Sequence, residues 1–240
     1  IELDNGKIRA VGCAVAMQGS SISDVDLASV ELRLNDDGFY TLMIGASDMG
    51  TGCDTILAQI AADCLDCELD NIVVQGVDTD LSPYDKGSYA SSTTYLTGMA
   101  VVKACKSLRE KVLYEGARLL DCAVEKAEFD GTRVLSLKDK RTISLAEIAN
   151  QSLVGTNNYI TASAYHSSPV SPPPYMAGIV EIELDKNTGK IEIIELTAVV
   201  DSGTLINPNL ARVQAEGGIA QGIGMALFED VKYDSRGRMM

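Results

Sequence analysis

The first stretch of this sequence that could do chemistry is residues 45–55, which combine glycine, hydroxyl and carboxylate side chains. A β-rich run at 39–44 precedes it, and the apolar run 56–62 that follows has the pattern of a helix. Glycine allows positive φ and close approach of a ligand to the backbone. The first N–H groups of a helix lack internal partners, so they can seat an anion such as a phosphate. The alternative is a tight strand-to-helix turn, in which Asp54 or Thr55 caps the helix.

A second hydroxyl-rich stretch, residues 87–94, precedes a second helical pattern. Ser91 or Ser92 is expected to cap that helix. The acidic loop at 78–85 just before it could hold a divalent ion, but carboxylates in such loops more often form turns and helix caps. The sequence therefore predicts two helix starts that are both suited to a phosphate-bearing ligand.

The cysteines give a weaker signal. Cys64 and Cys67 have the C-x-x-C spacing of a metal or redox site, but no second pair lies at zinc-ribbon distance. Cys53 lies inside the first glycine-rich stretch, where a small packed side chain is expected. In a chain of 240 residues, six scattered cysteines favour free thiols in a reducing compartment.

The overall composition excludes some classes of protein. The net charge of −14 argues against a nucleic-acid partner, because a protein binds the phosphate backbone of a nucleic acid with a basic face. No apolar run is long enough to span a membrane. These features predict a cytoplasmic protein. The chain begins at Ile1 and stops abruptly at Met240, which we interpret as a piece of a longer polypeptide.

The elements that must position these stretches alternate between strands and helices. Residues 168–174 are rich in proline and serine and form the best candidate boundary. We expect an α+β fold of two sheet-plus-helix subdomains, 1–168 with both glycine- and hydroxyl-rich stretches, and 169–240, truncated at its C-terminal end. The last helical pattern begins at Leu210 and contains four glycines, which predicts close packing against another backbone or a ligand.

Taken together, three groups of residues make the chain resemble the molybdenum-binding region of the xanthine dehydrogenase and aldehyde oxidase family. The groups are 47–52 with Thr55, 87–93, and 207–208 with 214–217 and 221–224. The resemblance covers nearly the whole chain and rests on the order and spacing of the groups. It implies the fold of the second molybdenum-cofactor-binding domain and a molybdopterin cofactor, which could extend to a dinucleotide. The cofactor contacts that it implies are Met49, Gly50, Thr51, Ala90, Ser91, Ser92, Thr93 and Gln214.

The resemblance also limits what this chain does. Many relatives have glutamine where Thr51 stands, so the hydrogen bond of that position is in question. The family's catalytic glutamate, its general base, is expected beyond Met240, and its molybdenum is held by the pterin. We therefore assign no catalytic and no metal-ligating residue in this chain, and we expect the isolated chain to be inactive.

The implied reaction of the whole assembly is the oxidation of a purine, N-heterocycle or aldehyde carbon with water as the oxygen source. Iron–sulfur clusters and FAD would lie on other domains or subunits, and the full assembly could be a homodimer. Two alternatives from other classes are a non-catalytic acidic subunit-interaction module and a phosphate-ligand enzyme that uses a divalent ion.

Overall fold

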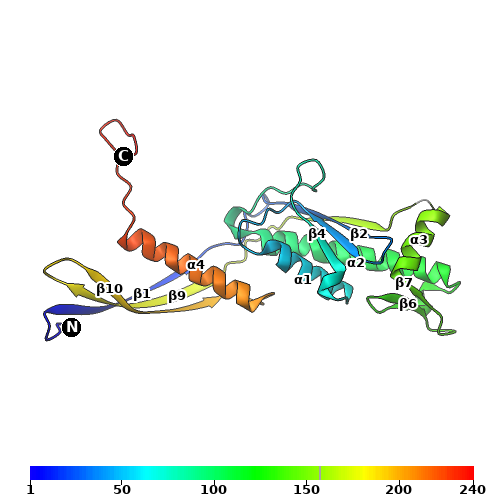
Figure 1. Cartoon of the computed structure of the whole chain (residues 1–240), viewed down its shortest axis with the longest axis horizontal. Helices are drawn as coiled ribbons and strands as arrows, with labels where there is room; N and C mark the ends of the chain where they lie inside the picture. Colours follow the sequence, from blue (N-terminus) through cyan, green and yellow to red (C-terminus); the bar gives the residue numbers. More distant parts are fainter. Residues whose placement is uncertain (157) are drawn as a thin grey trace. The chain divides into compact units, whose positions relative to one another are not determined.

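Helices and sheets are mixed along the chain, as the computed structural model in Figure 1 shows. The structure describes residues 1–156 and 158–240. Those residues form four α-helices and three sheets, which confirms the predicted α+β class. They divide into unit 1, Ile1–Gln18 with Pro173–Met240, and unit 2, Gly19–Pro172. Within the described ranges, every helix is too short or too polar to cross a bilayer.

Unit 2 is built on a four-stranded sheet of order β4-β3-β2-β8. Its strands are β2 (Ala28–Leu34), β3 (Tyr40–Ile44), β4 (Ile72–Gln75) and β8 (Thr161–His166). β2 alternates buried and half-buried residues, as its sequence predicts, and it pairs antiparallel with β3 so that Leu32 faces Leu42. β3 and β4 pair in parallel because α1 (Cys53–Leu65) connects them.

A long helix, α2 (Thr93–Leu119), packs against α1 and against the sheet of unit 2. Leu57 of α1, Leu108 of α2 and Leu42 of β3 are all fully buried in the shared core. Fully burying a leucine contributes about 1.5–3 kcal/mol, so this core holds both helices against the sheet.

A small third sheet and a short helix complete unit 2. The elements are β5 (Ala127–Phe129), β6 (Arg133–Ser136), β7 (Thr142–Ser144) and α3 (Leu145–Thr156), together with the 3-10 turns Leu69–Asn71, Tyr89–Ser91 and Val124–Lys126. The Ser-x-x-Glu spacing of residues 144–147 is that of a capping box, and the structure forms one. The Ser144 amide donates to Glu147 Oε2 at 2.9 Å, and the Glu147 amide donates to Ser144 Oγ at 3.3 Å.

Unit 1 contains an antiparallel sheet of order β1-β9-β10 and one helix. The elements are β1 (Lys7–Met17), β9 (Tyr175–Asp185), β10 (Ile191–Asp201) and α4 (Pro208–Leu227). Pairing of Lys7 with Asp185 and of Met17 with Tyr175 joins β1 to β9 along its whole length. The first strand thus belongs with the C-terminal segment, whereas we predicted it within a subdomain of residues 1–168. The predicted division at 168 stays a prediction about domains.

Three of the four glycines of α4 lack a close neighbour among the described residues, whereas a Cβ at Gly224 would lie 2.6 Å from Glu229 Oε1. A Cβ added to Gly217, Gly218 or Gly222 would meet no described atom within 4 Å. No residue of α4 is buried within the described chain. Asn207 caps this helix by accepting a hydrogen bond from the Leu210 amide at 3.1 Å. The described residues therefore supply no close backbone at Gly217, Gly218 or Gly222, and packing of this helix against a ligand stays a prediction.

Candidate functional site

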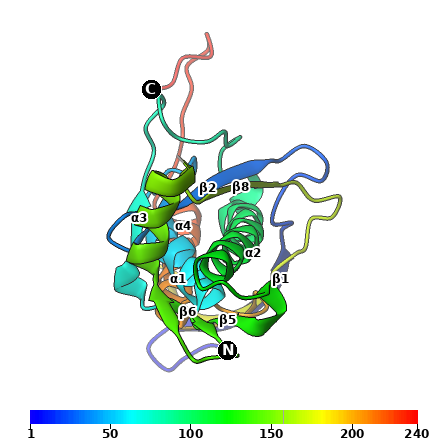
Figure 2. The ribbon, with the colours of Figure 1, turned by 90° about the vertical axis from the view of Figure 1, so that its right-hand side faces the viewer.

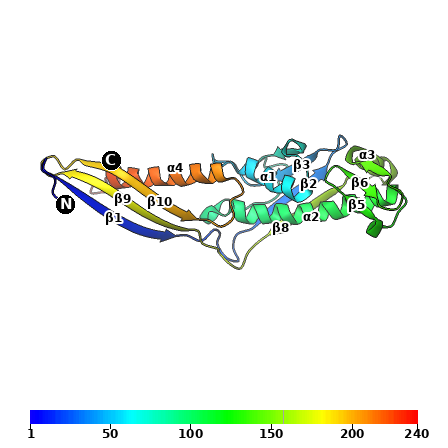
Figure 3. The ribbon, with the colours of Figure 1, turned by 90° about the horizontal axis from the view of Figure 1, so that it is seen from below.

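The two predicted helix starts lie at the same end of a parallel helix pair in unit 2. Arg109 of α2 donates to the carbonyl of Cys64 in α1 at 3.2 Å. Gly98 lies five residues after the start of α2, and Ile60 lies seven residues after the start of α1. A Cβ at Gly98 would lie 3.0 Å from Ile60 Cδ1. Residue numbers thus rise together along the contact, so α1 and α2 run parallel, and Figures 2 and 3 show them side by side. At 1.5 Å per residue, both helices start roughly 8–10 Å beyond the Gly98 level.

Asp48 organises the glycine-rich stretch 45–55, called the first loop below. Its Oδ1 accepts hydrogen bonds from the Gly50 amide at 2.9 Å and the Gly52 amide at 3.1 Å. Desolvation favours the neutral carboxyl, but the N–H groups of Gly52, Gly50, Asp54 and Thr51 outweigh it and hold the pKa of Asp48 below its usual value. Asp48 therefore occupies amides that lead into α1, and an anion seat on the first N–H groups of the helix itself stays a prediction.

The rest of the first loop offers side chains and an open backbone. Met49 is 70% exposed. Gly50 has φ +94°, and a Cβ added to it would have no neighbour within 4 Å. The residue that caps α1 is Gly52, in the left-handed conformation, and it makes no side-chain cap bond. The predicted caps at Asp54 and Thr55 are therefore wrong.

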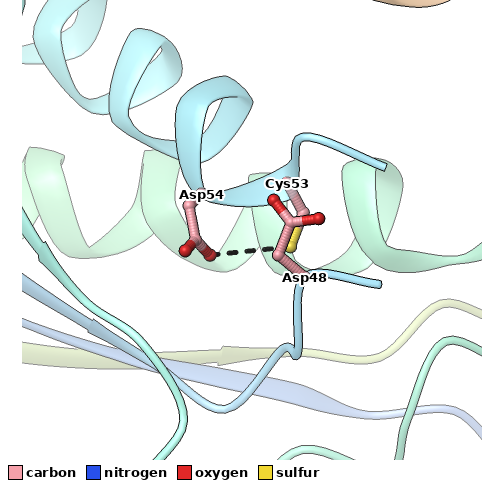
Figure 4. A group of neighbouring side chains, drawn as sticks. All are labelled: Asp48, Cys53 and Asp54. Atoms are coloured by element: carbon pink, nitrogen blue, oxygen red, sulfur yellow. Dashed lines mark hydrogen bonds between the residues drawn. The ribbon is translucent and has the colours of Figure 1, made fainter. Parts of the chain in front are cut away.

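Three side chains of this loop come close enough to suggest a metal site. Ligand atoms of Asp48, Cys53 and Asp54 lie within 4.8 Å of one another, and Figure 4 shows them around the start of α1. The Cys53 thiol donates to Asp54 Oδ1 at 3.7 Å. Burial, and then the charges of Asp48 and Asp54, raise the pKa of Cys53 to about 11. The turn hydrogen bonds that Asp48 accepts already account for the position of this side chain.

The hydroxyl-rich stretch 87–94, called the second loop below, has a strained backbone. Ala90 has φ 46° and ψ 36°, and Ser91 has φ 55°, so two consecutive residues other than glycine adopt the left-handed conformation. Such a conformation costs of order 1–3 kcal/mol per residue and is concentrated at ligand sites. Ser92 is buried and is the N-cap residue of α2, as one of the two predicted candidates, but its side chain makes no cap hydrogen bond. Thr93 Oγ1 and Ser88 Oγ share a hydrogen bond of 2.6 Å.

The acidic loop serves as a set of turns, the more common of the two roles considered above. Asp78 Oδ1 accepts from the Asp80 amide at 2.9 Å, and Asp85 Oδ1 accepts from the Gly87 amide at 2.7 Å. Thr97 of α2 donates to Asp85 Oδ2 at 3.4 Å. Asp85 thus ties the segment before the second loop to the helix that follows it. Its spacing, two residues before a glycine, is a turn signal that could have revealed this positioning role.

Gln214, the third part of the predicted site, lies on α4 in unit 1. Its side chain is exposed. The first and second loops, which carry Met49 to Thr51 and Ala90 to Thr93, belong to unit 2. Gln214 therefore stays a predicted cofactor contact.

Comparison with known proteins gives a consistent family. The sequence profile of the molybdopterin cofactor-binding domain matches residues 2–240. The chain is 36% identical over 234 residues to a probable hypoxanthine oxidase of Escherichia coli strain K12, which covers 94% of this chain and 24% of that protein. It is 31% identical over 240 residues to the 6-hydroxypseudooxynicotine dehydrogenase complex subunit gamma of Paenarthrobacter nicotinovorans, covering 98% of this chain and 30% of that subunit.

Solved structures agree. The quinoline 2-oxidoreductase of Pseudomonas putida 86 matches with a TM-score of 0.84 and 26% identity, over 98% of this chain and 32% of that one. A Cu,Mo-CO dehydrogenase in its carbon monoxide reduced state matches with a TM-score of 0.83 and 25% identity, over 98% and 31%. The chain thus spans about a quarter to a third of the length of the relatives it matches.

Proposed function

Since the chain belongs to the molybdopterin cofactor-binding domain family, we propose that its two loops in unit 2 hold the cofactor of a molybdenum hydroxylase. The chain is homologous to part of such enzymes. In this proposal the whole protein oxidises a purine, N-heterocycle or aldehyde carbon with water as the oxygen source. The observation that carries the proposal is the strained turn at Ala90 and Ser91, set at the start of α2 beside the start of α1.

The residues present fit a phosphorylated pterin at the second loop. The first N–H groups of α2 lack helical partners, and no side chain caps them at Ser92. Exposed Ser91 adds a hydroxyl, so this start offers an anion neutral donors in place of a basic patch. That explains how a chain with a net charge of −14 could bind a polyanion. The left-handed turn also places successive amides on one side of the backbone, as in anion-binding nests.

The first loop would contact the cofactor differently. Asp48 occupies its amides, so Met49, Gly50 and Thr51 would meet the pterin through side chains and through the uncovered backbone at Gly50. Gln214 would add an amide donor and acceptor for a pterin edge. When bound, the molybdenum centre supplies the redox chemistry and acidifies water. In this proposal the residues of this chain bind and orient the cofactor, and the general base comes from beyond Met240.

The remaining expectations are part of the same proposal. Iron–sulfur clusters and FAD would be held by other domains or subunits of a cytoplasmic assembly that could form a homodimer, and this chain alone would be inactive. The printed name of one relative, a dehydrogenase complex subunit gamma, supports assembly with other subunits.

The test is a charge placed at the second loop. Ser91→Asp in the native protein would set a carboxylate where the phosphate is proposed to lie, whereas Ser91→Asn is its neutral match. Both side chains tolerate the left-handed conformation, and an acidic residue at a helix start does not destabilise the helix. Ser92 is 2% exposed and is unsuitable, because a charge there would be buried.

We expect Ser91→Asp to lose most of its molybdenum and extractable pterin while its thermal unfolding matches that of Ser91→Asn. Normal pterin content in Ser91→Asp would refute the phosphate site at this loop. Wild-type protein from its native host without molybdenum or pterin would refute the whole proposal. In that case, an activity that depends on magnesium or calcium would favour the phosphate-ligand enzyme. Absence of such an activity would favour the interaction module.

A further inference from the structure

One edge of the sheet in unit 1 is a long, regular strand. The strand order is β1-β9-β10, so β1 lies at an edge, and Figure 3 shows it along one side of the sheet. Its pairing with β9 runs from Lys7 opposite Asp185 to Met17 opposite Tyr175 without a bulge. In an antiparallel pair, alternate residues turn their N–H and C=O groups toward the partner strand, and the residues between them turn theirs away. The outer side of β1 therefore presents one continuous row of backbone groups.

The turn at the start of the chain shows which residues form that outer row. The Arg9 amide donates to the Ile1 carbonyl at 2.8 Å, and the Ile1 amino group donates to the Arg9 carbonyl at 2.7 Å. The Leu3 amide donates to the Lys7 carbonyl at 2.9 Å. These groups of β1 take their partners from residues 1–3 instead of β9. The odd-numbered residues of β1 therefore turn their backbone outward.

The outer row is paired only over its first part. Val11, Cys13 and Val15 continue the same alternation, and within the described chain no hydrogen bond reaches their N–H or C=O groups. Their side chains are open as well, because Val11 is 67% exposed, Val15 is 84% exposed and Cys13 is exposed. Exposed Ile179 of β9 and Val199 of β10 extend this apolar surface across the same face of the sheet. An open edge of this kind is a template for another strand.

The edges formed by β10 and β8 are protected in ways that this part of β1 is not. β10 has a register shift between Ile193 and Glu195 and carries three carboxylate residues. At β8, Lys103 and Lys111 of α2 donate to strand carbonyls at 3.2 and 2.6 Å. Bulges, charges and lysines are the usual means of blocking an edge. Residues 10–17 contain no charge, no proline and no bulge, so this edge is built to be covered.

We propose that the polypeptide before Ile1 pairs with this edge as an antiparallel strand. Ile1 and Arg9 exchange two hydrogen bonds, which sets the register. The second, fourth and sixth positions before Ile1 then lie opposite Val11, Cys13 and Val15. Each of these positions donates to β1 and accepts from it. The unpaired row is filled, and the exposed side chains gain cross-strand neighbours.

This segment is favoured over a second copy of the chain or another protein because it is already delivered in register. Residues 1–3 lead directly to the open edge, so the strand closes only the short turn at Asn5 and Gly6, and short closures cost little entropy. The inference rests on the proposed function in one respect, namely that the whole protein extends beyond this chain. The chain spans about a quarter to a third of the relatives it matches.

The reading frame before Ile1 gives the first test. We expect a run rich in β-branched and aromatic residues, with no proline at the second, fourth or sixth position, because each of these positions must donate its N–H to β1. A proline at one of them, or a native protein that begins at Ile1, would overturn the proposal.

Hydrogen exchange of the native full-length protein, resolved to single amides by electron-transfer fragmentation, tests the pairing. The even-numbered amides 10–14 bond to β9 and are the internal control. We expect the odd-numbered amides 11–15 also to exchange at least roughly 100-fold more slowly than unpaired amides. Fast exchange of the odd set beside a protected even set would overturn the proposal. Because the pairing does not involve the cofactor, fast odd amides in a protein with normal pterin content would refute the strand alone, and protected odd amides in a protein without pterin would refute the proposed function alone.

A thiol cross-link identifies the strand that pairs. A cysteine introduced at the fourth position before Ile1 would lie about 4.5–5.5 Å from Cys13 between Cβ atoms, within reach of dibromobimane. A cysteine at the third position, on the opposite face, is the matched control. We expect the fluorescent link to Cys13 from the fourth position and not from the third. Protected odd amides without this link would overturn the assignment to this segment.

Two substitutions at Val15 test the role of the outward N–H. Val15→Pro removes that N–H and keeps the bonds to β9, whereas Val15→Ala loses the same side chain and keeps the N–H. We expect Val15→Pro to speed exchange of the Val11 and Cys13 amides at least about tenfold relative to Val15→Ala. Equal exchange in the two variants would contradict a strand paired at this edge. The wild-type comparison of odd and even amides decides the proposal even if Val15→Pro fails to fold.

Discussion

Removal of the Asp48 carboxylate should open the first loop and convert the start of α1 into an anion site. Asp48 Oδ1 accepts from the Gly50 and Gly52 amides at 2.9 and 3.1 Å, and the side chain is exposed. A capping interaction of this kind is worth about 1 kcal/mol, at the middle of the measured range. We therefore expect Asp48→Ala to lower the opening free energy of the loop by about 1 kcal/mol, a roughly fivefold change in the opening equilibrium.

Hydrogen exchange by mass spectrometry, read on the peptide that contains residues 48–55, measures this opening locally in the native protein. Exchange of that peptide should become about fivefold faster in Asp48→Ala, while peptides of β2 and α2 keep their rates. Asp48→Asn retains an acceptor without the charge and should give an intermediate rate. Equal exchange in all three proteins would refute the assignment of Asp48 as the partner of these amides.

The variant should also gain an affinity that the wild type lacks. With Asp48 gone, the amides at the start of α1 have no internal acceptor, so sulfate or phosphate should slow exchange of this peptide in Asp48→Ala and not in the wild type.

The pH dependence has a definite sign. Because the folded pKa of Asp48 is lowered, its contribution is fully present above the unfolded pKa of about 3.9 and is lost as pH falls through the folded pKa. Loop protection, corrected for intrinsic exchange, should therefore be constant from pH 5 to 8 and decline below about pH 4 in the wild type, but not in Asp48→Asn. A decline already at pH 6 would contradict this account.

Four further substitutions concern the stability of unit 2, and their effects are measured by thermal or urea unfolding of the native protein. Gly131→Ala should destabilise it by about 3 kcal/mol or more, because φ is +93° and the new Cβ would overlap the Asp66 carbonyl oxygen, whereas Gly155→Ala, in open helix, should stabilise it by up to about 1 kcal/mol. Ser144→Ala should cost about 1 kcal/mol through loss of the capping box, and a change below about 0.3 kcal/mol would contradict that role. Tyr40→Phe should be neutral or slightly stabilising, because the buried Tyr40 hydroxyl has no hydrogen-bond partner among the described residues; a loss above about 1 kcal/mol would reveal a missed partner.

Local patterns in the sequence predicted local structure well. The alternation in 28–34 and the turn residues at 35–38 are typical of a hairpin, and β2 and β3 form one; the Ser144–Glu147 spacing is typical of a helix start, and α3 begins there. Both depend on residues close in the chain, whose periodicity and hydrogen-bond chemistry can be read directly. The two helix starts were predicted for the same reason.

Long-range pairing could not be predicted in this way. β1 pairs with β9 across more than 150 residues, and nothing in the composition of 7–17 distinguishes that partner from β2. The glycines of α4 predicted a close neighbour, but a glycine pattern does not say whether that neighbour lies within the same chain. Identical local signals can serve several tertiary contexts, and only the contacts decide between them.

The two helix starts also show why residue types alone did not distinguish two kinds of site. Each carries glycine or hydroxyl residues before a helix, and the sequence analysis treated both as anion seats. Asp48 separates them, because a carboxylate placed two residues before Gly50 accepts from the amides that a phosphate would need. At the start of α2, the N-cap residue Ser92 makes no side-chain cap bond. The two residues before it, Ala90 and Ser91, adopt the left-handed conformation. The Ser92 amide donates to the Tyr89 carbonyl at 3.1 Å and closes a turn around these two residues. Backbone strain of this kind is concentrated at ligand sites. We therefore infer that the phosphate of the proposed cofactor belongs at Ala90 to Thr93, and that the first loop orients the pterin.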